Sequence, residues 1–255
     1  MDLGLADRRF LVAGASRGLG SAIATALAGE GARVAAVARG SVELDTTAAS
    51  IGAVAIAADL SDPDGARAAV EAAVDALGGL DGLVVNSGGP PPGVFRALDE
   101  KDWDRAIDGT LRSALRLIRS ALPHLEAGRD PAILINLSSS VREPIPGLIT
   151  SNVLRPGLAG LIKTLVDELA PIRINGVAPG RFNTARIRSL DESRAKQAGS
   201  SVEDVQAAMR ATIPLGRYGD PAELGRIAAV LLSPAASYVN GQILGIDGGM
   251  IRSLP

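Results

Sequence analysis

Seven short apolar runs alternate with stretches of helical periodicity along the 255-residue chain. Most of the runs are continuously apolar, which is typical of strands buried on both faces of a parallel sheet. Parallel strands joined through helices need right-handed βαβ crossovers, so the pattern predicts a doubly wound α/β sheet with helices on both faces. The seven predicted strands span residues 10–13, 33–37, 54–57, 82–85, 132–137, 172–177 and 242–246.

Helix boundaries are clearest at two Asp-Pro pairs. Asp62-Pro63 and Asp220-Pro221 each place an N-cap residue before a proline at the first helical position, and they predict helices running to residues 77 and 232. Further helical periodicity covers 21–29, 103–122 and 158–169. The segment 183–216 interrupts the alternation because it is long and charged. We expect it to be a lid over a substrate site, within a single domain spanning residues 1–255.

A glycine-rich turn directly follows the first predicted strand. The motif reads Gly14-Ala-Ser16-Arg17-Gly18-Leu19-Gly20. Its glycines allow a tight turn, and they let backbone N–H groups at the start of the next helix approach a pyrophosphate. In this strand–turn–helix context the motif predicts a dinucleotide-binding Rossmann fold.

The end of the second predicted strand selects between NAD and NADP. An acidic residue there would accept a hydrogen bond from a ribose hydroxyl, but the sequence reads Val37-Ala38-Arg39 and has no acid before Glu43. Arg39 and Arg17 can bind a 2′-phosphate, because guanidinium groups match phosphate oxygens. We therefore expect NADP(H) in preference to NAD. The alternative is that both arginines are solvated surface residues.

Composition excludes several kinds of site. The chain has no cysteine and one histidine, His124, which excludes disulfides, thiol catalysis and metal sites built from cysteine or clustered histidine. A net charge of −2 indicates neither nucleic acid nor an anionic membrane as a partner. The N-terminus lacks the pattern of a signal peptide, and no run reaches the ~18 apolar residues of a membrane span. We expect a cytoplasmic protein without a bound metal.

Several spaced motifs together resemble the short-chain dehydrogenase/reductase family over nearly the full chain, and its β-ketoacyl-ACP-reductase-like branch most closely. They include Asp59-Leu60 after the third predicted strand, Asn86-Ser87-Gly88-Gly89 after the fourth, and Pro179-Gly180 with Thr184 after the sixth. Residues 213–223 and 240–249 match the C-terminal third of the family. The resemblance implies that cofactor contacts come from Asp59, Leu60, Asn86, Ser87, Gly88, Pro179, Gly180 and Thr184.

The positions of the family's catalytic tetrad read differently in this chain. The tyrosine position is Ser151 and the lysine position is Arg155, where the resemblance implies a contact to the nicotinamide ribose. The asparagine position is Thr110. The serine position is Ser138 when counted back from Ser151, or Ser139 when matched to the preceding strand, and the sequence leaves both open.

These departures change the available acid chemistry. An alkyl hydroxyl such as that of Ser151 can polarise a carbonyl but is a far weaker acid than a phenol. Arg155 keeps a positive charge but cannot relay a proton, because guanidinium does not deprotonate in proteins. Glu143, in the pair Arg142-Glu143, is a possible alternative acid or a solvated surface residue. Pro156 predicts that the helix carrying this site begins near residue 156, which would leave Arg155 on a loop or at the helix start.

The resemblance implies an NAD(P)H-dependent oxidoreductase that reduces a carbonyl, 3-oxoacyl-like substrate by hydride transfer, with serine in place of tyrosine. The alternative is an NADPH-binding sensor or catalytically weak pseudoenzyme of the same fold, and non-redox chemistry such as elimination is a third possibility. The substrate would be a small molecule or an acyl thioester. Arginines in the segment 183–216 suit an anionic or acyl-carrier-linked substrate, or simply a solvated helix face. Family members usually form homodimers or homotetramers, and we expect the same here.

Overall fold

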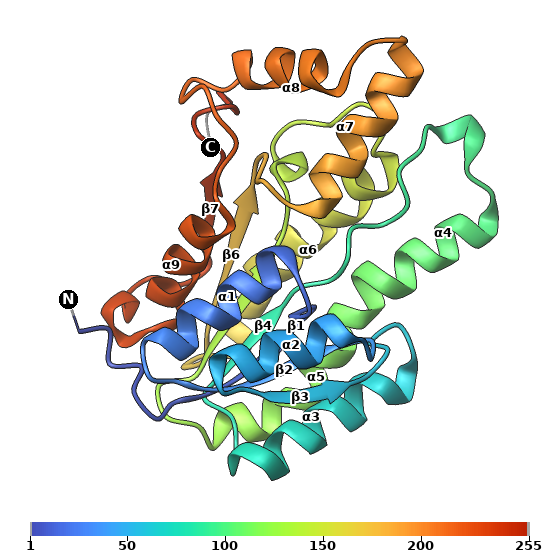
Figure 1. Ribbon diagram of the computed structural model, residues 1–255. Coiled ribbons are helices and arrows are strands. Elements are labelled where there is room, and N and C mark those ends of the chain that lie inside the picture. The colour runs from blue at the N-terminus through green and yellow to red at the C-terminus, as the bar shows by residue number, and fades with distance from the viewer. Residues whose placement is uncertain (1, 254–255) are drawn as a thin grey trace.

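All seven predicted strands are present in the structure, a computed structural model that describes residues 2–253 (Figure 1). They form one parallel sheet in the order β3-β2-β1-β4-β5-β6-β7. The central strands β1, β2, β4, β5 and β6 are buried, whereas the edge strands β3 and β7 are partly exposed. The strands are β1 (Arg9–Ala13), β2 (Arg33–Ala38), β3 (Val54–Ala57), β4 (Gly82–Val85), β5 (Ala132–Asn136), β6 (Arg173–Pro179) and β7 (Ile243–Ile246).

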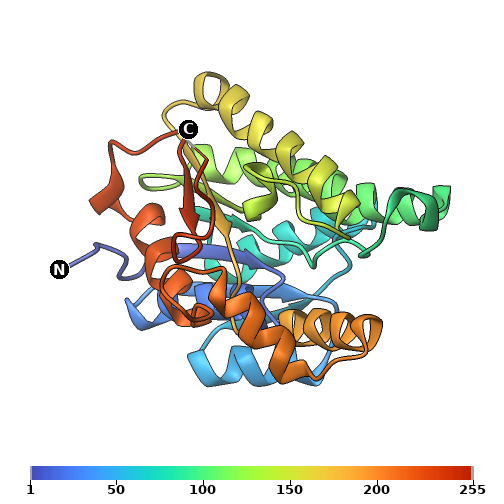
Figure 2. The same cartoon turned by 90° about the horizontal axis from the view of Figure 1, so that it is seen from above.

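Helices cover both faces of the sheet, as the doubly wound prediction requires (Figure 2). One layer consists of α1 (Gly18–Gly29), α2 (Val42–Ile51) and α9 (Pro221–Leu232), which share an apolar core with one face of the strands. The other layer consists of α3 (Pro63–Leu77), α5 (Ser113–Glu126) and α6 (Ile149–Glu168). Both layers bury leucine, isoleucine and alanine side chains, and burying a leucine-sized side chain contributes about 1.5–3 kcal/mol.

The two Asp-Pro helix starts are confirmed. The side chain of Asp62 accepts a hydrogen bond from Asp64 N at 2.8 Å, and Pro63 begins α3. The Asp220 side chain accepts from Ala222 N at 2.9 Å, and the Glu223 carboxylate accepts from the Asp220 N–H at 2.7 Å. Each cap satisfies backbone donors that the first helical turn leaves free.

The predicted late start of the α6 helix is wrong. The helix begins at Ile149 and continues through Pro156, so Ser151 and Arg155 both lie within it. Tertiary contacts hold its first turns and offset the hydrogen bond that the proline removes. Thr150 Oγ1 donates to the carbonyl of Pro91 at 2.8 Å. The side chain of Asn152 bonds both the N–H and the carbonyl of Ile145, at 3.0 and 2.9 Å.

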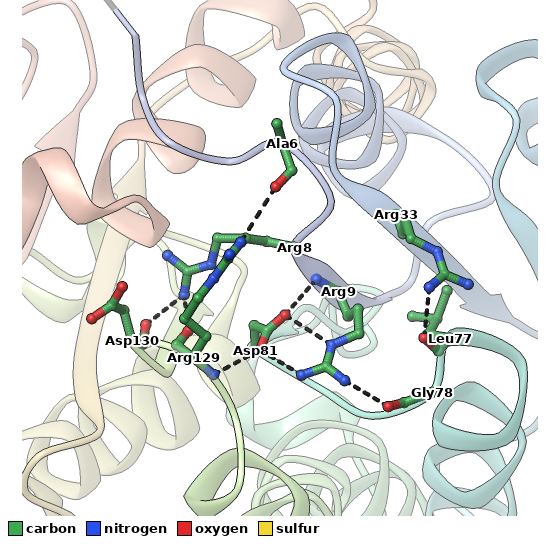
Figure 3. Close-up of polar contacts among 9 residues, drawn as sticks. All are labelled: Ala6, Arg8, Arg9, Arg33, Leu77, Gly78, Asp81, Arg129 and Asp130. Carbon is green, nitrogen blue, oxygen red and sulfur yellow. Dashed lines mark hydrogen bonds and ion pairs between the residues drawn. The ribbon is translucent and has the colours of Figure 1, made fainter.

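A cluster of charged residues links the amino end of β1 to the segments that precede β4 and β5 (Figure 3). Asp81, just before β4, accepts from the side chain and backbone N–H of Arg9 and from Arg129 N, at 2.7–2.9 Å. Burial raises the pKa of the Asp81 carboxyl, but these donors outweigh it and hold the pKa at about 2. Arg8, which is fully buried, donates to the carbonyls of Arg129 and Asp130.

The segment 183–216 folds into two helices at the opposite, carboxyl end of the sheet, α7 (Ala185–Ala198) and α8 (Val202–Ala211) (Figure 1). A buried carboxylate, Asp191, attaches α7 to the rest of the fold. It pairs with Arg181 and accepts from the Tyr218 hydroxyl at 3.0 Å. Across residues 2–253, none of the helices combines the length and apolarity needed to cross a membrane.

The short elements complete the connections between these layers. The helix α4 (Glu100–Ala106) runs into a π-helix, η2 (Ile107–Arg112), which leads into α5. The single helical segment predicted over 103–122 is therefore three elements. Three 3₁₀ turns occur at η1 (Phe95–Ala97), η3 (Ser139–Val141) and η4 (Pro234–Ala236).

Candidate functional site

The glycine turn after β1 has the geometry of a phosphate cradle. Gly14 and Gly18 have φ angles of +61° and +63°, a conformation that favours glycine. A Cβ atom on Gly20 would overlap the carbonyl oxygen of Gly14. The α1 helix begins at Gly18, and the side chain of Arg17 makes no capping hydrogen bond to it. The first N–H groups of the helix are thus available to an anion.

Two asparagine side chains hold this turn against the neighbouring strands. Asn86, at the end of β4, donates to the carbonyls of Ala13 and Gly14 at 3.1 and 3.2 Å. Asn136, at the end of β5, donates to Asn86 Oδ1 at 2.8 Å. The sequence indicated Asn86 but not Asn136. Ser87 and Gly88 extend the same loop beyond Asn86 and are half-buried and exposed, respectively.

The predicted 2′-phosphate residues lie at the edge of the turn. Arg17 and Arg39 are both exposed. Asp59 accepts from the Ser61 hydroxyl and backbone N–H at 2.6 and 2.9 Å, and these bonds, with a smaller effect of the Arg39 charge, lower its pKa. The next residue, Leu60, packs against the apolar core. A hollow of about 650 Å³ adjoins this edge, between Ser16 and Arg17 of the turn, Ser21 of α1, and helix α2.

Helix α7 begins beside the glycine turn. Thr184 caps α7 by accepting from Ile187 N at 3.3 Å, and its methyl group lies beside Gly18. Pro179 ends β6, and Gly180 N donates to the carbonyl of Ile246 at 2.9 Å. The residues predicted to contact the nicotinamide therefore follow β6 at the carboxyl edge.

Two serine hydroxyls meet at the start of α6. Ser140 Oγ and Ser151 Oγ are 3.2 Å apart, and both residues are buried. Ser138 instead caps the η3 turn by accepting from Ser140 N at 3.1 Å, and Ser139 is buried without a hydroxyl contact to Ser151. The sequence left Ser138 and Ser139 open as the family's serine position. In the structure it is the Ser140 hydroxyl that contacts Ser151. The run of three serines was the only signal for Ser140.

Arg155 is buried, with 5% of its surface exposed. Its Nη1 donates to the backbone carbonyl of Asn136, whereas its Nε has no hydrogen-bond partner among the described residues. Burial, with a smaller effect of the positive charge of Arg186, lowers the pKa of the guanidinium to about 10. The group is still charged at neutral pH.

Thr110 lies in the π-helix η2, which packs against α6. It is 1% exposed, and its hydroxyl has no partner within residues 2–253. The Oδ1 atom of Asn136 also lacks one. π-Helical turns occur frequently at functional sites, and buried polar atoms without partners are rare in folded proteins. Thr110 Oγ1, Asn136 Oδ1 and Arg155 Nε are three such atoms, on η2, β5 and α6.

Other side chains do not replace the missing phenol and amine. The Tyr218 hydroxyl donates to Asp191 of α7, and Tyr238 is fully exposed. Lys163 and Glu143 are also exposed. The carboxyl edge of the sheet therefore carries the glycine cradle, the serine pair and Arg155.

Comparison with known proteins places this geometry in a family. A family model described as "Enoyl-(Acyl carrier protein) reductase" matches residues 14–251. The chain is 34% identical over 249 residues to the 3-oxoacyl-[acyl-carrier-protein] reductase FabG of Staphylococcus aureus, covering 94% of this chain and 96% of the relative.

Solved structures agree with the sequence comparison. The L-sorbose reductase of Gluconobacter frateurii, complexed with NADPH and L-sorbose, matches with a TM-score of 0.94 and 29% identity over 100% of both chains. A short-chain alcohol dehydrogenase-like protein of Sinorhizobium meliloti matches with a TM-score of 0.90 and 35% identity over 98% of both chains. The chain therefore belongs to the short-chain dehydrogenase/reductase family, in its 3-oxoacyl-acyl-carrier-protein-reductase-like branch.

Proposed function

We propose that this protein is an NADPH-dependent reductase of a carbonyl, 3-oxoacyl-like substrate. The observation that carries the proposal is the serine pair, Ser140 and Ser151, one helical turn from a buried cation at the edge of a dinucleotide cradle. The oxidoreductase relatives support the reaction class, and FabG in particular supports a 3-oxoacyl group.

The residues present fit a dinucleotide. Gly20 has no side chain, and a Cβ atom at this position would overlap the Gly14 carbonyl oxygen in the cradle. The uncapped N-terminus of α1 offers N–H donors to a pyrophosphate. Arg17 and Arg39 would hold the 2′-phosphate of NADP, and no acid stands at the end of β2 to favour NAD. When bound, the nicotinamide ring supplies the hydride. The NADPH complex of the L-sorbose reductase supports the same preference.

The side chains of the site would stabilise the reacting carbonyl oxygen. One hydroxyl of the Ser140–Ser151 pair, polarised by the bond that it accepts from the other, would donate a hydrogen bond to it. Arg155 would oppose the negative charge that develops as the carbonyl carbon accepts a hydride. The proton that completes the alcohol comes from water through the serine hydroxyls, because neither hydroxyl is acidic enough to supply it by itself. Thr110 and Asn136 would hold that water with their unpartnered oxygens.

Binding and turnover test the proposal separately. NADPH and NADH are titrated by fluorescence, and the same samples are followed at 340 nm with β-ketoacyl thioesters, diketones and quinones. We expect tighter binding of NADPH than of NADH and oxidation with at least one ketone. Turnover that survives Ser140→Ala and Ser151→Ala unchanged would exclude the serine mechanism.

A second candidate function is an NADPH-binding sensor or weak pseudoenzyme. It is favoured by one observation, that neither phenol of the chain lies beside Ser140 and Ser151. This candidate predicts tight NADPH binding without turnover, and gain of turnover in the double variant Ser151→Tyr with Arg155→Lys. A homodimer or homotetramer stays a prediction from the resemblance.

A further inference from the structure

The charged helix α7 has little apolar packing to hold it in place. Of its 14 residues, Asp191 and Ala195 are the ones that are buried, and α8, which follows it, buries none. In most helices of folded proteins the stability comes from packing an apolar face. The position of α7 therefore depends largely on polar contacts, and its one buried charged side chain, the carboxylate of Asp191, has 0% of its surface exposed.

The chain enters and leaves the α7–α8 segment through two adjacent stretches of backbone, which we call the neck (residues 181–183 and 217–219). A parallel bridge pairs Phe182 with Gly219, and Gly219 N donates to the Arg181 carbonyl at 2.9 Å. A Cβ atom on Gly219 would overlap the Phe182 ring. The two sides of the neck are thus in close contact with each other.

Each side of the neck is also fixed to the rest of the fold. Just before the entering side, Gly180 N donates to the carbonyl of Ile246 in β7 at 2.9 Å. On the returning side, Arg217 binds both carboxylate oxygens of Glu223, in the first turn of α9, at 2.7 Å each. The neck therefore gives α7 a fixed support.

The carboxylate of Asp191 contacts both sides of this support. It forms an ion pair with Arg181 on the entering side, and it accepts from the Tyr218 hydroxyl on the returning side at 3.0 Å. The Arg181 guanidinium lies over the Tyr218 ring, 5.0 Å from its centre. The side chains of the ion pair are 11% and 0% exposed for Arg181 and Asp191, so salt and water weaken the pair much less than a surface pair.

The same helix face carries Thr184, the residue that caps α7 beside Gly18 of the glycine turn. Asp191 follows Thr184 by seven residues, and residues seven apart lie on one side of an α-helix, about two turns along. The direction of these two turns is therefore set at one end by the neck. Arg181, which holds Asp191, comes directly after Pro179-Gly180 at the end of β6.

We propose that Asp191 is a positioning residue of the cofactor site, which acts through Arg181 and Tyr218 to hold Thr184 against the glycine turn and so retains the bound dinucleotide. The inference rests on the proposed function, because it takes the glycine turn to bind NADPH. Without the carboxylate, α7 would lean away from the turn and the dinucleotide would leave faster. Its rate of association would change little, because altered contacts act mostly on dissociation.

The rate of NADPH dissociation tests this proposal without any turnover. The full-length protein loaded with NADPH is mixed with excess NADP⁺ in a stopped-flow instrument, and the change in NADPH fluorescence gives the rate. We expect Asp191→Asn to raise the dissociation rate about tenfold and to leave the association rate within about twofold. Glu192→Gln is the matched control, because it removes an exposed carboxylate from the next position of α7 and should leave both rates unchanged.

A double-mutant cycle distinguishes positioning from general destabilisation. Tyr218→Phe keeps the ring over Arg181 and removes the bond to Asp191, so we expect a rise in dissociation of about threefold. Because both bonds end on one carboxylate, the rise in the double variant with Asp191→Asn should be smaller than the product of the two single effects. Hydrogen exchange should increase in residues 184–217 of each variant and stay unchanged in β4 and β5.

Unchanged dissociation rates in both Asp191→Asn and Tyr218→Phe would overturn the proposal. Effects that multiply independently, or faster hydrogen exchange throughout the sheet, would also overturn it by indicating a purely structural role. If Asp191→Asn fails to fold, Tyr218→Phe decides alone, because it leaves the ion pair of Arg181 intact.

The proposed reductase function can fail separately from this inference. Faster NADPH loss in the variants, together with a wild-type protein that reduces no ketone, would reject the reductase function and keep the role of Asp191. Ketone reduction by the wild type, together with variants whose NADPH dissociation is unchanged, would do the reverse.

Discussion

The hydroxyl oxygens of Ser140 and Ser151 lie 3.2 Å apart, joining the 3₁₀ turn after β5 to the start of α6. One hydroxyl can donate to the other while the second donates outward. The pair therefore presents a single polarised hydroxyl where relatives of the family are expected to present a phenol. This arrangement leads to the first prediction.

Removing either hydroxyl should impair catalysis and spare cofactor binding. We expect Ser140→Ala and Ser151→Ala each to lower kcat/KM by about a hundredfold, the usual effect of losing one oxyanion donor. Steady-state kinetics and NADPH titration measure the two effects. Thr164→Ala is the control, since Thr164 is an exposed residue of the same helix whose hydroxyl bonds only the carbonyl of Gly160. Equal losses in turnover and in NADPH affinity would indicate a structural role.

The close approach at Gly20 should be intolerant of any side chain. A methyl group there meets the Gly14 carbonyl, so we expect Gly20→Ala to lower stability by about 1–3 kcal/mol and to weaken NADPH binding. Gly29→Ala in the same helix, where no atom lies within 4 Å, should instead stabilise the protein by about 0.5–1 kcal/mol. Urea unfolding of both variants would show opposite signs, and a loss of stability at both sites would contradict the model of a local clash.

The arginines at the cradle edge should discriminate between the two cofactors. We expect Arg39→Ala to raise the Kd for NADPH about tenfold to a hundredfold, because a charge-assisted hydrogen bond to the 2′-phosphate is lost. The Kd for NADH should change little. Arg67→Ala, at an exposed surface pair on α3, provides the control titration. Parallel weakening of NADPH and NADH would show that Arg39 does not contact a 2′-phosphate.

Stability should depend on pH through Asp81. The pKa of its carboxyl is lowered from 3.8 to about 2 in the fold, so its stabilising effect is present above about pH 4 and is lost as the pH falls towards 2. We expect Asp81→Asn to cost about 2 kcal/mol at pH 7, and the difference from wild type to shrink between pH 4 and pH 2. Asp64→Asn, at an exposed ion pair, should cost less than about 0.5 kcal/mol. A pH-independent difference for Asp81→Asn would contradict this account.

The fold was predictable because its signals are local. Buried parallel strands must be continuously apolar, and the Asp62-Pro63 and Asp220-Pro221 pairs fix helix starts within a few residues of sequence. The glycine turn was equally predictable, because the φ angles and close approach that it needs exclude other residues.

The rest of the site depends on tertiary contacts that spacing does not reveal. The start of α6 was missed because Pro156 disfavours a helix locally. The preceding turn is held by a bond from Thr150 to the distant Pro91 carbonyl and by bonds of Asn152 to Ile145 in the loop before the helix. The π-helical turn around Thr110 has nearly the apolar spacing of an α-helix. The choice of Ser140 over its neighbours depends on the direction of the chain after β5, which three identical residues cannot encode.

The charged cluster around Asp81 has a practical consequence for protein engineering. It joins the amino ends of the strands, whereas Ser140, Ser151 and Arg155 lie beyond their carboxyl ends. A combinatorial library confined to the carboxyl-end positions would leave the bonds of Asp81 with Arg9 and Arg129 unchanged. Most of its members should therefore express in folded form. New specificities could then be screened for activity directly, without a prior round of stabilising mutations.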